Sequence, residues 1–138
     1  MYAIKAAVRD PSAASWTFKA QKTMYGGKRI RKGDEIFVFA SENEGGRGLV
    51  ASGVVSSAEG IPRRVGIARQ TPRVSITVKR TGSTRRRLGR NELKPFAGSN
   101  DERPESELHF RFYRQATNKI IGLTEGTAAF LRTFFKPK

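Results

Sequence analysis

The basic residues are the part of this sequence best able to take part in chemistry. Lysine and arginine together number 27 against 12 acidic residues, which gives the 138-residue chain a formal net charge of +15. Ten of these basic residues lie between Ile61 and Arg90, a segment that contains no acidic residue. A solvated surface normally mixes both signs of charge, so a block of one sign predicts a surface that contacts phosphates. The residues expected to make these contacts are Arg63, Arg64, Arg69, Arg85, Arg86 and Arg87. A basic loop that stays in solvent is the plainer alternative.

Few residues could support catalysis. The chain has no cysteine and one histidine, which excludes disulfides, thiolate zinc sites and cysteine nucleophiles. The histidine, His109, falls in an expected strand without a predicted partner, and we expect a structural role for it. Asp34 and Glu42 could bind Mg²⁺, but isolated acids are a weak metal signal, and Asp34 follows Gly33 as a turn residue would. The sequence therefore predicts no catalytic residue, no metal and no cofactor.

The element expected to organise the fold is a strand over residues 36–41, which follows the turn at Gly33-Asp34. Its side chains alternate between two faces, with Ile36, Val38 and Ala40 on one and Phe37, Phe39 and Ser41 on the other. Because both faces carry apolar residues, we expect the strand to be covered on both sides. The Gly-rich residues 42–46 predict a hairpin to a second strand at 49–55, in which Gly53 indicates a bulge or a close backbone approach.

Alternating and helical patterns predict the remaining elements. Strands are expected at residues 2–8, 73–79 and 108–114, with a weak candidate at 65–68. A short helix is expected at 10–20 with Asp10 as its N-cap, a helical turn at 88–93 and a loop at 97–107. A last helix is expected to begin at Thr124, and its apolar stripe should cover the central sheet. That stripe consists of Phe130, Leu131, Phe134 and Phe135.

About six short strands with two or three short helices predict an α+β fold, in which peripheral helices close a mixed β barrel. The length fits one domain, residues 1–138. No segment approaches the roughly 18 apolar residues of a membrane span, and the first residues lack the pattern of a secretory signal. We therefore expect a cytoplasmic protein without a membrane partner.

Several short motifs are spread along the chain. They are Trp16, the basic approach to Gly33-Asp34, the strand 37–41, the Asn/Gly loop after it, the Ser52-Gly53 pair and the tail 107–135. Together they resemble the EVE branch of the PUA-like superfamily. The ASCH branch is less similar, because the segment 27–31 lacks the acidic member of the ASCH motif. The resemblance implies a PUA-like pseudobarrel of five or six strands with peripheral helices, and a non-enzymatic role in nucleic-acid binding.

The resemblance also implies a small aromatic-lined pocket that holds an extruded, often modified base. Trp16 would form one wall, while Phe39, Ser41 and Asn43 would lie along the strand and loop of the pocket. A base gains about 1–3 kcal/mol by stacking on an aromatic ring, and its edge needs hydrogen-bonding groups. Core positions for Trp16 and Phe39, and local turn hydrogen bonds for Ser41 and Asn43, are the structural alternatives. The sequence departs from many EVE domains in lacking a tryptophan in the first strand, and in having Ala40 where a bulkier polar residue is common.

Three functions are consistent with these features. The first is a binding module whose pocket holds a modified or extruded base of RNA or DNA, while the basic block holds phosphates. The second is a general RNA-binding or ribosome-associated protein, whose binding depends on charge and falls steeply with salt. The third is a metal-dependent nuclease. The motifs and the localised charge together favour the first.

Overall fold

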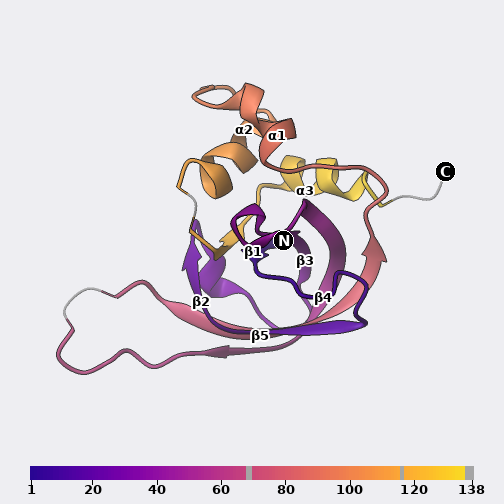
Figure 1. The fold of residues 1–138 in the computed structure, drawn as a ribbon. Coiled ribbons are helices and arrows are strands. Elements are labelled where there is room, and N and C mark those ends of the chain that lie inside the picture. The colour runs from indigo at the N-terminus through magenta and orange to yellow at the C-terminus, as the bar shows by residue number, and fades with distance from the viewer. Residues whose placement is uncertain (68–69, 116, 136–138) are drawn as a thin grey trace.

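Six strands close into a barrel in the computed structural model, which describes residues 1–67, 70–115 and 117–135. Their order around the barrel is β1-β3-β4-β5-β2-β6 (Figure 1). The strands are β1 (Tyr2–Ala6), β2 (Ser15–Met24), β3 (Glu35–Ala40), β4 (Gly48–Gly60), β5 (Arg73–Ser83) and β6 (Lys119–Gly122). The pairs β1–β3 and β2–β6 are parallel and the other neighbours are antiparallel. The mixed barrel predicted from the sequence is confirmed.

Three short α-helices of the described residues gather over one end of the barrel (Figure 1). They are α1 (Arg90–Leu93), α2 (Pro104–Leu108) and α3 (Glu125–Arg132). Three 3₁₀ turns are described, η1 (Gly27–Arg29), η2 (Glu42–Glu44) and η3 (Lys94–Phe96), and a π-helical segment, η4 (His109–Tyr113), continues α2. None of the helices in the described ranges is long and apolar enough to cross a membrane.

Strand β3 is buried on both faces, as its sequence predicts. Ile36 and Val38 belong to the cluster that fills the barrel, to which the other strands contribute. Phe37 and Phe39 belong to a second cluster between the barrel and the helices, which includes Leu131. Burying one such side chain contributes about 1.5–3 kcal/mol, so the two clusters fix the barrel and the helices to the same strand. The apolar stripe of the last helix therefore covers the central sheet, as predicted.

Gly53 lies where β4 and β5 approach closely. The register of β4 against β5 shifts between Ser52 and Gly53, which is the irregularity predicted from the sequence. A Cβ atom at Gly53 would lie 2.6 Å from Cγ1 of Val78 and 2.7 Å from the carbonyl oxygen of Lys79. The strand therefore needs glycine here because no side chain fits. A left-handed backbone is not the reason, since Gly53 does not have a positive φ.

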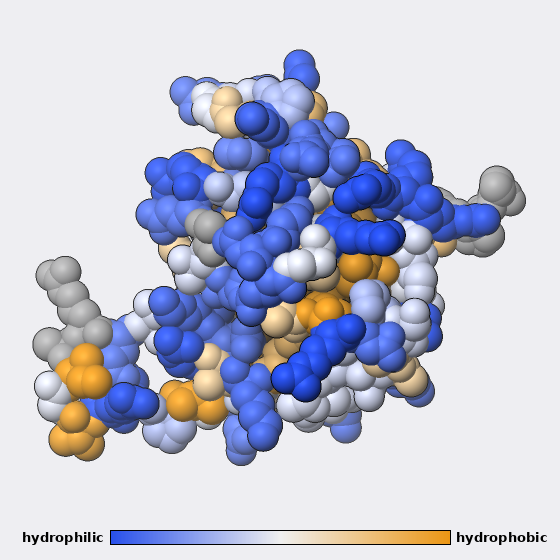
Figure 2. Space-filling model, in the orientation of Figure 1, coloured by the Kyte–Doolittle hydropathy of each residue, from blue (hydrophilic) through white to orange (hydrophobic). Residues whose placement is uncertain are grey.

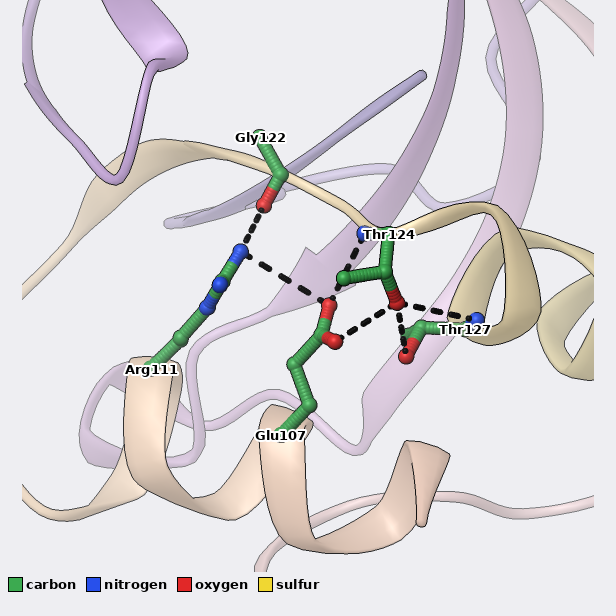
Figure 3. Close-up of polar contacts among 5 residues, drawn as sticks. All are labelled: Glu107, Arg111, Gly122, Thr124 and Thr127. Atoms are coloured by element: carbon green, nitrogen blue, oxygen red, sulfur yellow. Dashed lines mark hydrogen bonds and ion pairs between the residues drawn. The ribbon is translucent and has the colours of Figure 1, made fainter. Parts of the chain in front are cut away.

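A polar network joins the C-terminal helices to the barrel (Figure 3). Thr124 caps α3 with its hydroxyl, which accepts a hydrogen bond from the Thr127 N–H at 3.3 Å. The Glu107 carboxylate accepts hydrogen bonds from the Thr124 N–H at 3.1 Å and from its hydroxyl at 2.7 Å. Arg111 pairs with Glu107 at 3.7 Å and donates to the carbonyl of Gly122 at 2.8 Å. The predicted N-cap is confirmed, and Glu107 connects α2 to the start of α3.

The helix predicted at residues 10–20 is wrong, because most of that segment belongs to β2. Asp10 forms a turn, in which its carboxylate accepts from the Ser12 N–H at 2.9 Å. From residue 15 the side chains alternate, with Trp16 and Phe18 directed toward the barrel cluster and Thr17 exposed. Pairing with β5 satisfies the backbone and buries the aromatic side chains, and this tertiary gain outweighs the helical start signal.

The strand predicted at residues 108–114 is also wrong. Leu108 and Phe112 are fully buried, whereas Phe110 is 47% exposed. Two buried residues four positions apart lie on one face of a helix, so the alternating pattern concealed a helical one. His109 therefore lies on η4, with its ring centroid 6.4 Å from that of Tyr113. The strand near the end of the chain is instead β6, whose four residues were too few to give a pattern.

Smaller corrections concern loops and strand lengths. The loop predicted at 97–107 ends earlier, because α2 begins at Pro104. Residues 65–67 form no strand, and residue 68 of that candidate lies outside the described residues. Strands β4 and β5 both extend beyond the predicted 49–55 and 73–79. Asp34 is a turn residue, as predicted, since its carboxylate accepts from the Arg31 N–H at 2.7 Å.

Candidate nucleic-acid interface

The run Arg85–Arg87 forms an ordered arch at the start of β4. On one side of the run, the Thr84 N–H donates to the carbonyl of Val50 at 3.1 Å. On the other side, the carbonyl of Leu88 accepts from the Leu49 N–H at 2.8 Å. Because both anchors lie on adjacent residues of β4, the three arginines between them must loop outward.

The arginines of the arch do different work. Arg86 binds the residues just after α3, because its Nη2 donates to the hydroxyl of Thr133 at 3.1 Å and its guanidinium lies 4.0 Å from the ring centroid of Phe134. Arg85 and Arg87 have exposed side chains that make no hydrogen bond or ion pair with another described residue. Arg86 thus holds the arch in place, and its two neighbours are available for a ligand.

A cleft of about 540 Å³ lies beside the arch. Val8, Ala40, Leu49 and Val50 form its apolar part. Five arginines surround it, namely Arg9, Arg47, Arg85, Arg86 and Arg87. Figure 2 shows apolar surface in a hollow among hydrophilic side chains, on the face crossed by the chain between β1 and β2. An apolar floor with a cationic rim suits a ligand that is flat and apolar in one part and anionic in another.

One wall of the cleft is the segment 9–12, which two side chains hold in position. The indole Nε1 of Trp16 donates to the carbonyl of Asp10 at 2.9 Å. The Arg80 guanidinium donates to the carbonyls of Ser12 at 3.0 Å and Ala13 at 2.7 Å. Arg80 belongs to the basic segment between Ile61 and Arg90, but these hydrogen bonds give its guanidinium a structural role.

The opposite wall is the turn between β3 and β4, where glycine allows close packing. The Gly46 N–H donates to the carbonyl of Ser41 at 2.8 Å. A Cβ atom at Gly46 would lie 2.5 Å from the carbonyl of Ala40. Gly45 has a φ of +85°, which disfavours other residues. Glycine at positions 45 and 46 therefore allows the turn to pack against Ala40 at the rim of the cleft.

The structure does not bring the four predicted base-pocket residues around one cavity. Phe39 is fully buried, with its ring centroid 5.0 Å from that of Phe112. Ser41 and Asn43 line a second hollow of about 520 Å³, and Asn43 also accepts a hydrogen bond from Arg90 Nη2 at 2.6 Å. Trp16 is half-buried against Phe18 and lines neither the cleft nor this second hollow. A base-binding role for these residues stays a prediction.

The predicted phosphate-binding residues divide between two places. Arg85, Arg86 and Arg87 lie at the start of β4, whereas Arg63 and Arg64 follow its other end. They do not form the single surface that the sequence predicted, because β4 and β5 together separate them. Arg69 lies outside the described residues. Their role in phosphate binding stays a prediction.

Sequence reasoning missed Arg9 and Arg47, which complete the cationic rim. Each stands apart from the basic block, one just after β1 and the other in the Gly-rich turn. Nothing local distinguishes them from ordinary surface arginines. Only closure of the barrel, which brings the ends of β1 and β3 beside the start of β4, places them at the cleft.

Two buried lysines lie opposite one another on β1 and β6, and sequence reasoning missed them as well. Lys5 and Lys119 are 1% and 2% exposed. Lys5 donates to the carbonyl of Phe112 at 2.7 Å, and Lys119 to that of Thr117 at 3.0 Å. Burial lowers the pKa of Lys5, and burial followed by the charges of Lys5 and Lys22 lowers the pKa of Lys119 to about 8.

The acidic residue Glu42, one of the two considered for Mg²⁺, is engaged in hydrogen bonds within the fold. Glu42 accepts hydrogen bonds from the Tyr113 hydroxyl at 3.0 Å and from the Arg90 N–H at 2.7 Å. Burial, together with the charge of Glu42, raises the pKa of Tyr113. Among the described residues, no group of three or more His, Cys, Asp or Glu side chains could hold a metal ion.

The barrel is similar to a solved structure, the DUF55 domain of human thymocyte nuclear protein 1. The two share 13% sequence identity with a TM-score of 0.63, and the match covers 96% of each chain. The chain therefore shares the fold of that domain, and this agrees with the mixed barrel and peripheral helices that the sequence predicted. No family model matches the chain, and no curated protein matches it.

Proposed function

We propose that this chain is a non-enzymatic nucleic-acid-binding module, in which the cleft holds one unstacked base, modified or plain, and the arginines around it hold the adjoining phosphates. The observation that carries the proposal is the arginine arch beside an apolar floor in a cleft of about 540 Å³. That volume suits a ligand of nucleotide size. The net charge of +15 would concentrate polyanions at this surface.

The base would be held by apolar contact and by guanidinium stacking. None of the described residues that line the cleft is aromatic. Val8 and Val50, which are half-buried, offer apolar contact in place of a stacking partner. An arginine plane can stack on a base as an aromatic ring does. In this proposal Trp16 acts indirectly, because its bond to Asp10 holds one wall of the cleft.

The phosphates would be held by Arg85 and Arg87. Their side chains are exposed and make no polar contact with another described residue, so phosphate binding by the two guanidinium groups breaks no existing side-chain interaction. The arch is fixed at both ends, which reduces the entropy lost when its arginines bind. Contacts of this kind position a strand without reading its sequence.

Fluorescence anisotropy with a labelled single-stranded oligonucleotide at two salt concentrations tests the proposal. The variant Arg85→Gln/Arg87→Gln removes two cleft charges. Its matched control, Arg31→Gln/Lys32→Gln, removes two exposed charges from the turn before β3, at the opposite end of that strand from Ala40. Each lost phosphate contact should reduce the steepness of the plot of log affinity against log salt concentration by about 0.7. The cleft variant, which loses two such contacts, should reduce it by about 1.4. The control should bind as the wild type does.

Equal losses in the two variants would contradict the proposal, and would favour the general RNA-binding or ribosome-associated alternative. Cleavage of the oligonucleotide that requires Mg²⁺ and disappears in Asp34→Ala would favour the nuclease instead. RNA and DNA oligonucleotides of the same sequence should be compared, because the cleft contacts proposed here are available to both.

A further inference from the structure

Beyond the barrel ends of β4 and β5, the described residues 61–67 and 70–72 form an arm that projects away from the helices (Figure 1). At its base the Ile61 N–H donates to the carbonyl of Arg73 at 2.9 Å. Thr23 on β2 donates to the carbonyl of Pro72 through its N–H at 3.0 Å and its hydroxyl at 2.8 Å. The arm is thus anchored to the barrel at its base.

The tip of the arm displays apolar side chains in solvent. Val65 is fully exposed and Ile67 is 45% exposed. The Gln70 side chain holds this tip together, because its Oε1 accepts from the Arg64 N–H at 2.9 Å and its Nε2 donates to the carbonyls of Arg64 at 2.7 Å and Ile67 at 3.1 Å. Two aliphatic side chains that are exposed together on a braced turn are in position to contact a partner.

The charge of the arm indicates the chemistry of its partner. Residues 61–72 include no acidic side chain. A hollow of about 510 Å³ runs along the arm, and its lining includes Lys22, Arg63, Arg64 and Arg73. Cations that flank an aliphatic tip match a nucleic-acid duplex, in which phosphates flank stacked base pairs. Architectural proteins insert aliphatic wedges between base steps in this way.

We infer that the arm binds duplex DNA, with Arg63 and Arg64 on the phosphates and with Val65 and Ile67 as an apolar wedge that enters between base pairs. The inference rests on the proposed function and adds to it a partner class and a second contact. Apolar wedges of this kind enter through the minor groove of DNA and kink the duplex, whereas double-stranded RNA is recognised mostly by its shape and by contacts to 2′-hydroxyls and phosphates.

Arm and cleft can engage the same duplex. They lie at opposite ends of β4, which has 13 residues. A strand of that length spans at most about 40 Å. One turn of duplex is about 34–36 Å long. A duplex of about two turns therefore reaches both contacts.

The test uses a duplex DNA of about 20 base pairs that carries 2-aminopurine, whose fluorescence rises when the base unstacks. The variant Val65→Ser/Ile67→Ser removes the wedge, and the matched control Val65→Ile/Ile67→Val exchanges the two side chains and keeps it apolar. The wild type and the exchange variant should bind and should raise the fluorescence. The serine variant should lose about tenfold in affinity and the fluorescence rise. Gln70→Ala should weaken duplex binding in the same direction, because the tip loses its brace.

Each contrary outcome is distinguishable from a failure of the proposed function. Unchanged duplex binding by the serine variant overturns the inference, even where Arg85→Gln/Arg87→Gln still weakens binding to single strands. An equal loss on duplex RNA of the same sequence overturns the assignment to DNA. Self-association of the wild type that the serine variant abolishes overturns it in favour of a protein interface. Absence of any nucleic-acid binding overturns both proposals.

Discussion

Replacing Lys119 with methionine should change how the stability of the fold depends on pH. Lys119 lies on β6 opposite Lys5 on β1, and both side chains are buried. Burial, followed by the charges of Lys5 and Lys22, lowers the pKa of Lys119 from 10.5 to about 8. Between these two values the folded chain carries a neutral amine, while the unfolded chain still binds the proton.

The sign and size of the effect follow from this difference. Below pH 8 both states carry the charge, and the folded state bears the full cost of its burial. Between pH 8 and 10.5 the unfolded state binds more protons, so the free energy of unfolding of the wild type rises with pH relative to Lys119→Met. The gap between the two pKa values corresponds to at most about 3 kcal/mol. Solvent screening reduces this, and we expect about 1–2 kcal/mol.

Urea unfolding of both proteins at a series of pH values measures the effect. The quantity to plot is the difference between their free energies of unfolding, in which most other titrating groups cancel. Lys79→Met removes an exposed lysine on β5 and serves as the control for the loss of one lysine. A difference for Lys119→Met that does not change between pH 8 and 10.5 would refute the claim that burial of the charged Lys119 destabilises the fold.

Three further substitutions test the packing and the cleft wall. Gly53→Ala places a Cβ within 2.6 Å of Val78, and should lower the free energy of unfolding by about 1–3 kcal/mol in urea. Glu107→Gln turns one acceptor of the Figure 3 network into a donor and should cost about 1 kcal/mol in the same assay, whereas no loss would mean that α3 docks without it. Trp16→Phe keeps an aromatic ring but loses the bond to Asp10, so affinity for a single-stranded oligonucleotide should fall severalfold at an unchanged melting temperature. Unchanged affinity there would show that the wall needs no such bond.

Two kinds of element could be predicted well from the sequence. One is a strand with apolar residues on both faces, and the other is a helix whose capping residues lie within its first turn. β3 could be predicted because both of its faces are apolar, and each face enters a separate cluster. The start of α3 could be predicted because Thr124 and Glu125 act within one turn. β2 could not, since its partner β5 lies about 60 residues away in sequence and only that pairing outweighs the start signal at Asp10.

The candidate site was predictable only where charge is concentrated along the chain. The run Arg85–Arg87 was found from charge density alone, although its ordered arch depends on β4. Arg9 and Arg47 could not be found, because the cleft is assembled from three separate segments. The sequence predicts Trp16 to be a stacking platform, whereas its indole donates to the carbonyl of Asp10 and its ring stacks on Phe18. A lone tryptophan in a sequence does not reveal which of its neighbours it will contact.

Titration of the isotopically labelled protein with a nucleoside monophosphate, followed through backbone amide resonances, tests the central claim most directly. A saturable shift centred on the amides of Gly45, Gly46, Arg47 and Val50 is the expected result, because these residues line the cleft. The shift should weaken in Arg85→Gln/Arg87→Gln. Shifts confined to Ser41, Asn43 and Asn118 would place the ligand in the second hollow instead, and no saturable shift would contradict a base-binding cleft altogether.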